Sequence, residues 1–151
     1  MKKFYFSLNK VLAYKEQTEE SLRNEYMQRA LRVVEQEKVI QELNAQYDHH
    51  CKVLEDGKRN GCTVGFMKLY ETYLGNLQIQ MDKEHEILVC LKEKEEEKRK
   101  ELMEAKIEKA SIEKLKEKKQ EQYQKMVQKE EELLVEEFVS NIASLKKVEI
   151  S

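Results

Sequence analysis

The histidines and cysteines are the residues of this chain that could bind a metal ion, and their spacing argues against it. His49 and His50 are neighbours. Neighbouring side chains on a helix point about 100° apart, so the two rings cannot reach one ion as a His-x-x-x-His pair can. His50, Cys51 and Cys62 could approach one another near a turn, but no fourth ligand accompanies them. We therefore expect solvated histidines and a thiol that packs in the helix seam, with no metal and no cofactor.

Acid–base catalysis and phosphate binding are also poorly supported by the residue pattern. Asp and Glu together number 30, but a catalytic carboxylate pair needs a partly dry cleft that shifts its pKa values. The segment Gly57-Lys58-Arg59 lacks the spacing of a phosphate-binding loop, and no strand pattern precedes it. The charged runs are typical of solvated helix faces, and the chain is predicted not to be an enzyme.

The composition predicts long helices that would position any functional residues. The 151 residues include no Pro and only four Gly, and 38% of them are charged. Without Pro, no missing amide donor or ring clash interrupts a helix, and the abundant Glu, Lys, Leu, Gln and Met all favour helix. Disorder is the alternative for so charged a chain. It is disfavoured because 40% of the residues are hydrophobic and these recur at regular spacing.

Charge and leader patterns indicate the compartment and exclude some partners. Lys and Arg number 28, the net charge is −2 and the signs are interleaved, so nucleic acid is not an expected partner. Polar residues break the apolar start at residues 1–6 before it reaches the length of a signal sequence. No stretch is apolar enough to span a membrane. Together with the odd number of cysteines, these features predict a cytosolic protein.

One break divides the helical pattern. All four glycines lie between Gly57 and Gly75, and Asp-Gly and Asn-Gly pairs mark turns. Gly57 fits the C′ position of a first helix and Thr63 the N-cap of a second. We expect helix over about 7–56, a turn over about 57–64 and helix over about 65–145. The predicted fold is all-α, a single antiparallel two-helix coiled-coil hairpin over 1–151 with a longer second helix.

Apolar residues recur every seven positions on both sides of this turn, as in a left-handed coiled coil. Before the turn only Glu19 interrupts the series. The first series is Leu12, Glu19, Tyr26, Val33, Ile40, Tyr47 and Leu54. After the turn, the two interleaved series are Tyr70, Leu77, Leu91, Ala105 and Ile112, and Leu74, Met81, Leu88 and Leu102.

A turn centred near position 61 predicts the register of the hairpin. Facing residues should have numbers that add up to about 121, because short connections favour antiparallel neighbours. This register sets Val33 against Leu88 and Ile40 against Met81, so apolar residues face one another. The exception is the run 92–101, which has no apolar residue. We expect this waist to be helical but loosely packed.

The register leaves about thirty C-terminal residues without an intramolecular partner. This overhang nevertheless carries an amphipathic pattern, and unpartnered apolar surface of this kind marks a binding face. The alternative is that two such tails fray or dimerise. The apolar residues are Leu133, Leu134, Val135, Phe138, Val139, Ile142 and Leu145.

A second candidate surface lies near the turn, where the chain offers more bulk than a narrow seam needs. Tyr73 and Leu77 are four residues apart on one flank, and the register places Leu43 across from them. Tyr is enriched at interaction hot spots. We interpret Tyr73 as an exposed recognition residue and Leu43 and Leu77 as weaker candidates. The remaining bulky residues, Tyr47, Tyr70 and Leu74, are assigned to the seam.

Several segments resemble the flagellar export protein FliJ family. The start at residues 3–12, KFYFSLNKVL, is similar to the family's beginning, in which a basic residue and Phe-x-Phe precede Val-Leu. The segment 69–77, LYETYLGNL, resembles the part of the family that follows its glycine-containing loop. Glu136-Glu137-Phe138 resembles its acidic and aromatic C-terminal stretch. The resemblance covers essentially the whole chain.

The resemblance implies a role that the composition cannot supply. FliJ-like proteins act as a stalk of the flagellar type III export apparatus, contacting the export ATPase hexamer, the cytoplasmic domain of the export gate and export chaperones. It implies a cytoplasmic protein at the inner face of the inner membrane, reaching the membrane only through the gate. The implied gate residues are Leu43, Tyr73 and Leu77. The residues implied for the ATPase ring or chaperones are Phe4, Phe6, Leu134, Phe138 and Ile142.

Two other functions remain open for a helical hairpin of this kind. A prefoldin-like chaperone subunit usually carries a β-hairpin between its helices, for which the 57–65 loop is too short. A homodimeric coiled-coil scaffold would bury its C-terminal apolar residues in itself.

Overall fold

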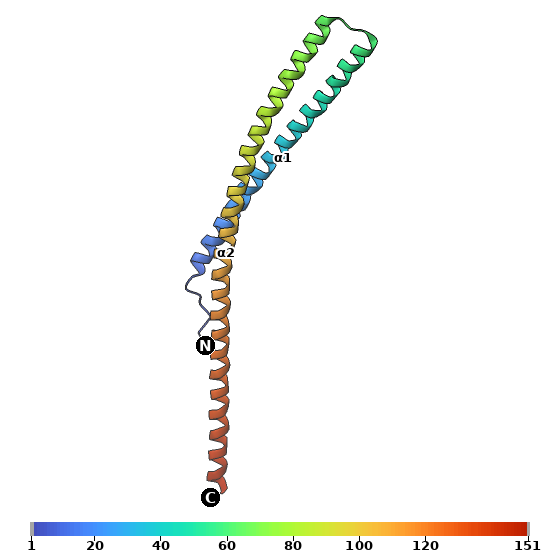
Figure 1. The fold of residues 1–151 in the computed structure, drawn as a ribbon. Helices are drawn as coiled ribbons and strands as arrows, with labels where there is room; N and C mark the ends of the chain where they lie inside the picture. The colour runs from blue at the N-terminus through green and yellow to red at the C-terminus, as the bar shows by residue number, and fades with distance from the viewer. Residues whose placement is uncertain (1, 151) are drawn as a thin grey trace. The chain divides into compact units, whose positions relative to one another are not determined.

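The computed structural model describes residues 2–150 and contains two helices, α1 (Asn9–Asn60) and α2 (Val64–Ile150) (Figure 1). The helices comprise 52 and 87 residues, and no strand occurs among the described residues. The chain divides into two compact units, residues 19–104 and residues up to 18 with those from 105 onward. The predicted all-α hairpin with a longer second helix is confirmed.

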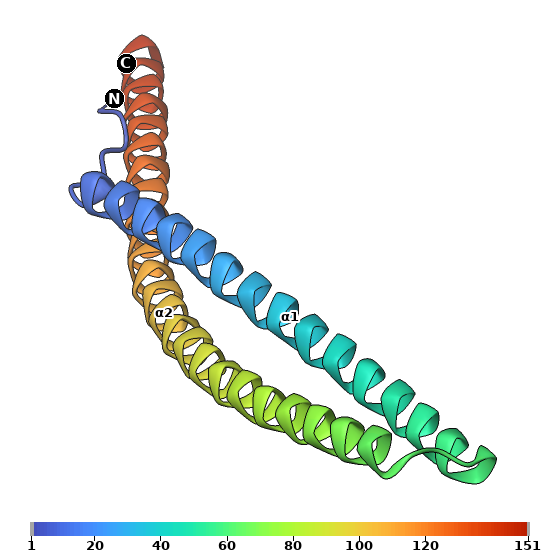
Figure 2. The same cartoon turned by 90° about the horizontal axis from the view of Figure 1, so that it is seen from above.

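A loop of three residues, 61–63, joins the helices (Figure 2). Gly61 has a φ of 82°, the left-handed conformation that glycine adopts without steric cost. The expectation that Gly57 ends the first helix is wrong, because α1 continues for three further residues and Lys58 and Arg59 complement its C-terminal dipole. The Thr63 cap is confirmed, since its Oγ1 accepts a hydrogen bond of 3.2 Å from the Phe66 amide.

The two kinds of glycine are expected to respond oppositely to alanine. Gly61→Ala should lower the free energy of unfolding by about 1 kcal/mol, because a Cβ is strained at positive φ. Gly75→Ala should raise it by about 0.5–1 kcal/mol, because Gly75 is inside α2 with open space where its Cβ would lie. Urea denaturation followed by circular dichroism measures both. Equal effects of the two variants would contradict this assignment of the turn.

The seam of unit 19–104 follows the predicted heptads. Every described member of the three heptad series within this unit is buried or half-buried. Gln36 donates from its Nε2 to the backbone oxygen of Glu84 at 3.0 Å and to the Glu84 carboxylate. This pair confirms the antiparallel register. The polar exception, Glu19, is buried and lies 2.5 Å from Arg23 one turn later, so its charge is compensated within α1.

Polar contacts, rather than apolar ones, join the helices at the waist, residues 92–101. It is helical as predicted, and none of its residues is buried. Lys98 lies 2.8 Å from Glu25 of α1 and 3.0 Å from Glu101. The hydrogen bond from Lys98 lowers the pKa of Glu25, and the bond to Glu25 raises the pKa of Lys98. Such exposed pairs add little to stability, so apolar packing on either side of the waist holds the helices together.

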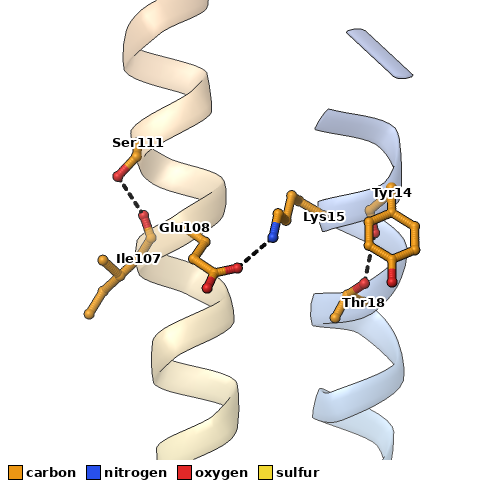
Figure 3. A network of polar contacts seen from close by, with 6 residues as sticks. All are labelled: Tyr14, Lys15, Thr18, Ile107, Glu108 and Ser111. Carbon is orange, nitrogen blue, oxygen red and sulfur yellow. Dashed lines mark hydrogen bonds and ion pairs between the residues drawn. The ribbon is translucent and has the colours of Figure 1, made fainter. Parts of the chain in front are cut away.

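In the other unit, α1 begins beside the middle of α2. Lys15 Nζ lies 2.6 Å from the Glu108 carboxylate across the two helices, as Figure 3 shows. Leu12 and Ala105 are buried in this unit. Residues 2–8 precede α1 without helical structure, and we call this segment the N-terminal strap. Its end is fixed where the Asn9 amide donates to the Phe6 carbonyl at 3.1 Å.

Candidate partner-binding surfaces

The C-terminal part of α2 presents an apolar stripe on an uncovered helix. Every described residue from 128 to 149 is exposed, and Phe138 has 66% of its surface accessible. Residues spaced three and four apart lie on one face of a helix. The predicted candidates Leu134, Phe138 and Ile142 share this face. We call it the C-terminal stripe, and its members are Leu134, Val135, Phe138, Ile142 and Leu145.

This stripe continues the face with which α2 packs inside the same unit. Tyr123 and Val127 are half-buried, and the next positions in the same helical step are Leu134 and Phe138. Acidic residues at 130–132 and 136–137 flank the first half of the stripe, and Lys146 and Lys147 flank its end. The surface therefore combines an apolar centre with charged edges, the layout of a protein interface.

The N-terminal strap corrects one predicted site residue. Phe6 was expected to be a partner-binding residue, but only 3% of its surface is accessible. The reason is that the strap folds onto α2 and buries this ring. Phe4 is half-buried, with its ring centroid 5.6 Å from that of Tyr123, and the Tyr123 hydroxyl donates to the Lys2 carbonyl.

A groove remains between the strap and α2. It has a volume of about 630 Å³ and is lined mainly by apolar and aromatic side chains of the strap and of residues 115–126. Phe4 therefore remains on an accessible surface, whereas Phe6 belongs to the packing beneath it. Tyr123 was missed in the sequence, because the predicted register sets residue 4 opposite about residue 117 and leaves residue 123 without a partner.

On the predicted surface near the turn, around Leu43, Tyr73 and Leu77, two of the three residues are not exposed. Leu43 and Leu77 were the weaker candidates for recognition, but both are buried, Leu77 with 6% of its surface accessible. They form one cluster with Leu54 and Leu74. Large half-buried residues on both helices widen the seam near the turn. The wider seam shields this cluster from solvent. These half-buried residues are Tyr47, Cys51, Phe66, Met67, Tyr70 and Met81.

Tyr73 keeps an accessible face on this flank. It has 42% of its surface accessible, and its ring meets that of His50 edge-on with centroids 4.9 Å apart. His50 also lies against Tyr70, at 5.9 Å, and its Nδ1 is buried without a hydrogen-bond partner. The expectation that His50 is solvated is therefore wrong, because the register places it opposite residues 70–73, where aromatic rings cover it. Tyr73 is thus held by aromatic packing rather than free to move.

The described residues offer little support for other chemistry. Within residues 2–150, no group of three His, Cys, Asp or Glu could hold a metal ion. Across the same range, neither helix has a stretch both long and apolar enough to cross a membrane.

Comparison with known proteins connects this arrangement to one family. The family model for the flagellar FliJ protein matches residues 4–147, which include the N-terminal strap from Phe4, both helices and the C-terminal stripe. Searches among curated proteins and among solved structures each gave no match. Since the family match spans nearly the whole chain, this protein belongs to the flagellar FliJ family.

Proposed function

We propose that the chain is a stalk of the flagellar type III export apparatus whose C-terminal stripe enters the ring of the export ATPase. Membership of the family gives it a role in flagellar protein export as a non-enzymatic component. The observation that carries the proposal is the stripe itself, an apolar face on a helix that no other described residue covers. The proposed site of action is the cytoplasm, at the membrane base of the flagellum.

The mechanism proposed for such a stalk involves no chemistry by its own side chains. A rigid helix inside a ring contacts the subunits unequally, because its apolar and charged faces point in different directions. Unequal contacts favour some subunit conformations over others, so binding shifts the equilibrium among them. The same contacts couple ring assembly or nucleotide turnover to events at the gate only if both partners bind the chain.

Removing two stripe side chains tests the ring contact. Leu134→Ala with Phe138→Ala should raise the concentration of the chain needed for half-maximal stimulation of the export ATPase by about tenfold or more, as truncation of buried anchors does. The hairpin should stay folded, because both side chains are exposed. ATPase rates measured against chain concentration, with circular dichroism on each variant, give the result.

The matched control is Leu133→Ala. Leu133 is exposed and directly precedes Leu134 in the chain, but it lies about 140° around the helix from Phe138. It should leave stimulation unchanged. Equal losses for Leu133→Ala and the double stripe variant, or no loss for either, would disprove the stripe as the ring contact.

We further propose that Tyr73 contacts the cytoplasmic domain of the export gate, and that the strap region around Phe4 serves the ring or the export chaperones. Tyr73→Ala should weaken binding to the gate domain about tenfold, since it removes an aromatic anchor. Tyr73→Phe keeps the ring that packs on His50 and should retain most of the affinity. Calorimetric titration with the isolated gate domain measures both. Full affinity of Tyr73→Ala would remove this contact.

A further inference from the structure

We infer that, in the absence of other partners, the C-terminal stripe pairs with the same stripe of a second copy, the two helices running antiparallel. This inference goes beyond the proposed function, because it concerns the chain alone. The first observation is continuity. In its own unit α2 contacts the strap through Tyr123, and the same helical step continues through Val127 into the stripe. A second helix on the stripe would therefore extend an existing seam.

The second observation is the segregation of charge along the exposed helix. Glu131 and Glu132 stand at one end of the stripe and Lys146 and Lys147 at the other. Antiparallel pairing that crosses near Val139 sets the acidic end of each copy beside the basic end of the other. Parallel pairing in register would set acid beside acid and base beside base. Flanking charges of this kind determine the orientation of coiled coils.

The same crossing point also aligns the apolar residues. It sets Leu134 of one copy near Leu145 of the other and places Phe138 near the centre. The exposed helix from 128 to 149 has a length of about 33 Å at 1.5 Å per residue, which accommodates about three heptads from each copy. Three heptads are enough for a continuous seam, and the residues at the crossing point itself, Phe138, Val139 and Ser140, are uncharged.

The size of this contact makes the pairing reversible. Two helices of this length bury on the order of 1,000 Å², at the low end of specific interfaces, where complexes are transient. The pair should therefore form at high concentration and separate when another partner binds the stripe. Self-pairing would cover an apolar surface that otherwise invites aggregation, and it would compete with any other occupant.

Charge reversal tests the pairing with the full chain. Sedimentation equilibrium should show the mass rising from one chain towards two between about 1 μM and about 1 mM. Lys146→Glu with Lys147→Glu should raise the dissociation constant about tenfold or more, because like charges then meet at both ends. Adding Glu131→Lys and Glu132→Lys to the same chain restores opposite charges and should return the dissociation constant to near its original value.

A constant mass of one chain over the whole range would overturn the inference and leave the stripe to other proteins. A dimer that ignores charge reversal would also overturn it, because the pairing would then use another surface. These measurements contain no ATPase, so their failure is distinguishable from failure of the proposed function.

Disulfide trapping tests the orientation. Cys51, Cys62 and Cys90 are first replaced by serine, with helix content checked by circular dichroism. A mixture of chains carrying Leu134→Cys and chains carrying Leu145→Cys should form the mixed disulfide under mild oxidation. Leu134→Cys chains alone should not link, since these positions lie at opposite ends of an antiparallel pair. Efficient linking of Leu134→Cys chains with one another would show a parallel pair and contradict the inference.

Discussion

Leu77→Ala is expected to lower the free energy of unfolding of unit 19–104 by about 2–4 kcal/mol. Leu77 is buried in a cluster with Leu43, Leu54 and Leu74, close to the turn that joins the helices. Truncation loses the transfer free energy of the side chain and leaves a cavity, because rigid neighbouring helices relax only in part. The midpoint of urea unfolding, followed by circular dichroism at 222 nm, is the measurement.

The matched control is Leu69→Ala, two helical turns earlier in α2, where 70% of the leucine surface is accessible. It should change stability by less than about 0.5 kcal/mol. Both variants remove the same atoms from the same helix, so a difference between their stabilities is due to the burial of Leu77. If Leu77→Ala unfolds at the same midpoint as Leu69→Ala, Leu77 is a surface residue and regains its place among the recognition candidates.

Register and fold class could be predicted because they depend on local, repeated signals. The seven-residue repeat specifies which face of each helix is buried, and one short turn specifies which positions meet. The Gln36–Glu84 hydrogen bonds and the buried positions Val33 and Ile40 agree with that prediction. The exposure of Phe138 followed from the same arithmetic, because the first helix is too short to reach it.

The errors arose where tertiary packing decides between similar local signals. Gly57 and Gly61 both follow a turn-forming residue, and sequence propensity does not choose between them. The structure leaves Gly57 in the helix, where an added Cβ would lie 3.0 Å from the Phe66 ring, and uses Gly61 for the turn. Leu43 was misplaced because the seam widens around half-buried aromatic residues, and the width of a seam is not encoded in its period. The burial of Leu77 agrees with its place in a predicted heptad series and contradicts only its second assignment, as a recognition residue.

Which side chains of the strap are buried could not be predicted from the seven-residue repeat. Residues 2–8 are not helical, so no heptad predicts which of their side chains is buried. The alternation along the strap decides this: Phe6 is buried and Phe4 half-buried, whereas Tyr5 points outward with 80% of its surface accessible. In an extended segment, successive side chains point to opposite sides. The motif that carries the family resemblance at the start of the chain is therefore a packing motif in part.

Phe6→Ala is expected to release the strap while α1 and α2 stay helical. Phe6 has 3% of its surface accessible, and truncation of a buried Phe typically costs about 3 kcal/mol or more. The hydrogen bond from the Tyr123 hydroxyl to the Lys2 carbonyl, which attaches the strap to α2, is exposed and contributes about 1 kcal/mol at most. The free energy lost with the Phe6 ring should therefore exceed the free energy that still holds the strap on α2. The strap then opens locally, without unfolding of the helices.

Hydrogen exchange of the Asn9 amide, which donates to the Phe6 carbonyl and is followed by NMR spectroscopy, reports this opening directly. Phe6→Ala should speed exchange there by about a hundredfold, the factor that corresponds to about 3 kcal/mol, and leave amides in unit 19–104 unchanged. Tyr5→Ala removes an aromatic of similar size from the outward side and should leave exchange of the Asn9 amide within about threefold of the original. If the two variants exchange alike, Phe6 does not hold the strap. Its ring would then be free for a partner, as the family resemblance implies, and the groove beside it would be a binding surface rather than a gap in packing.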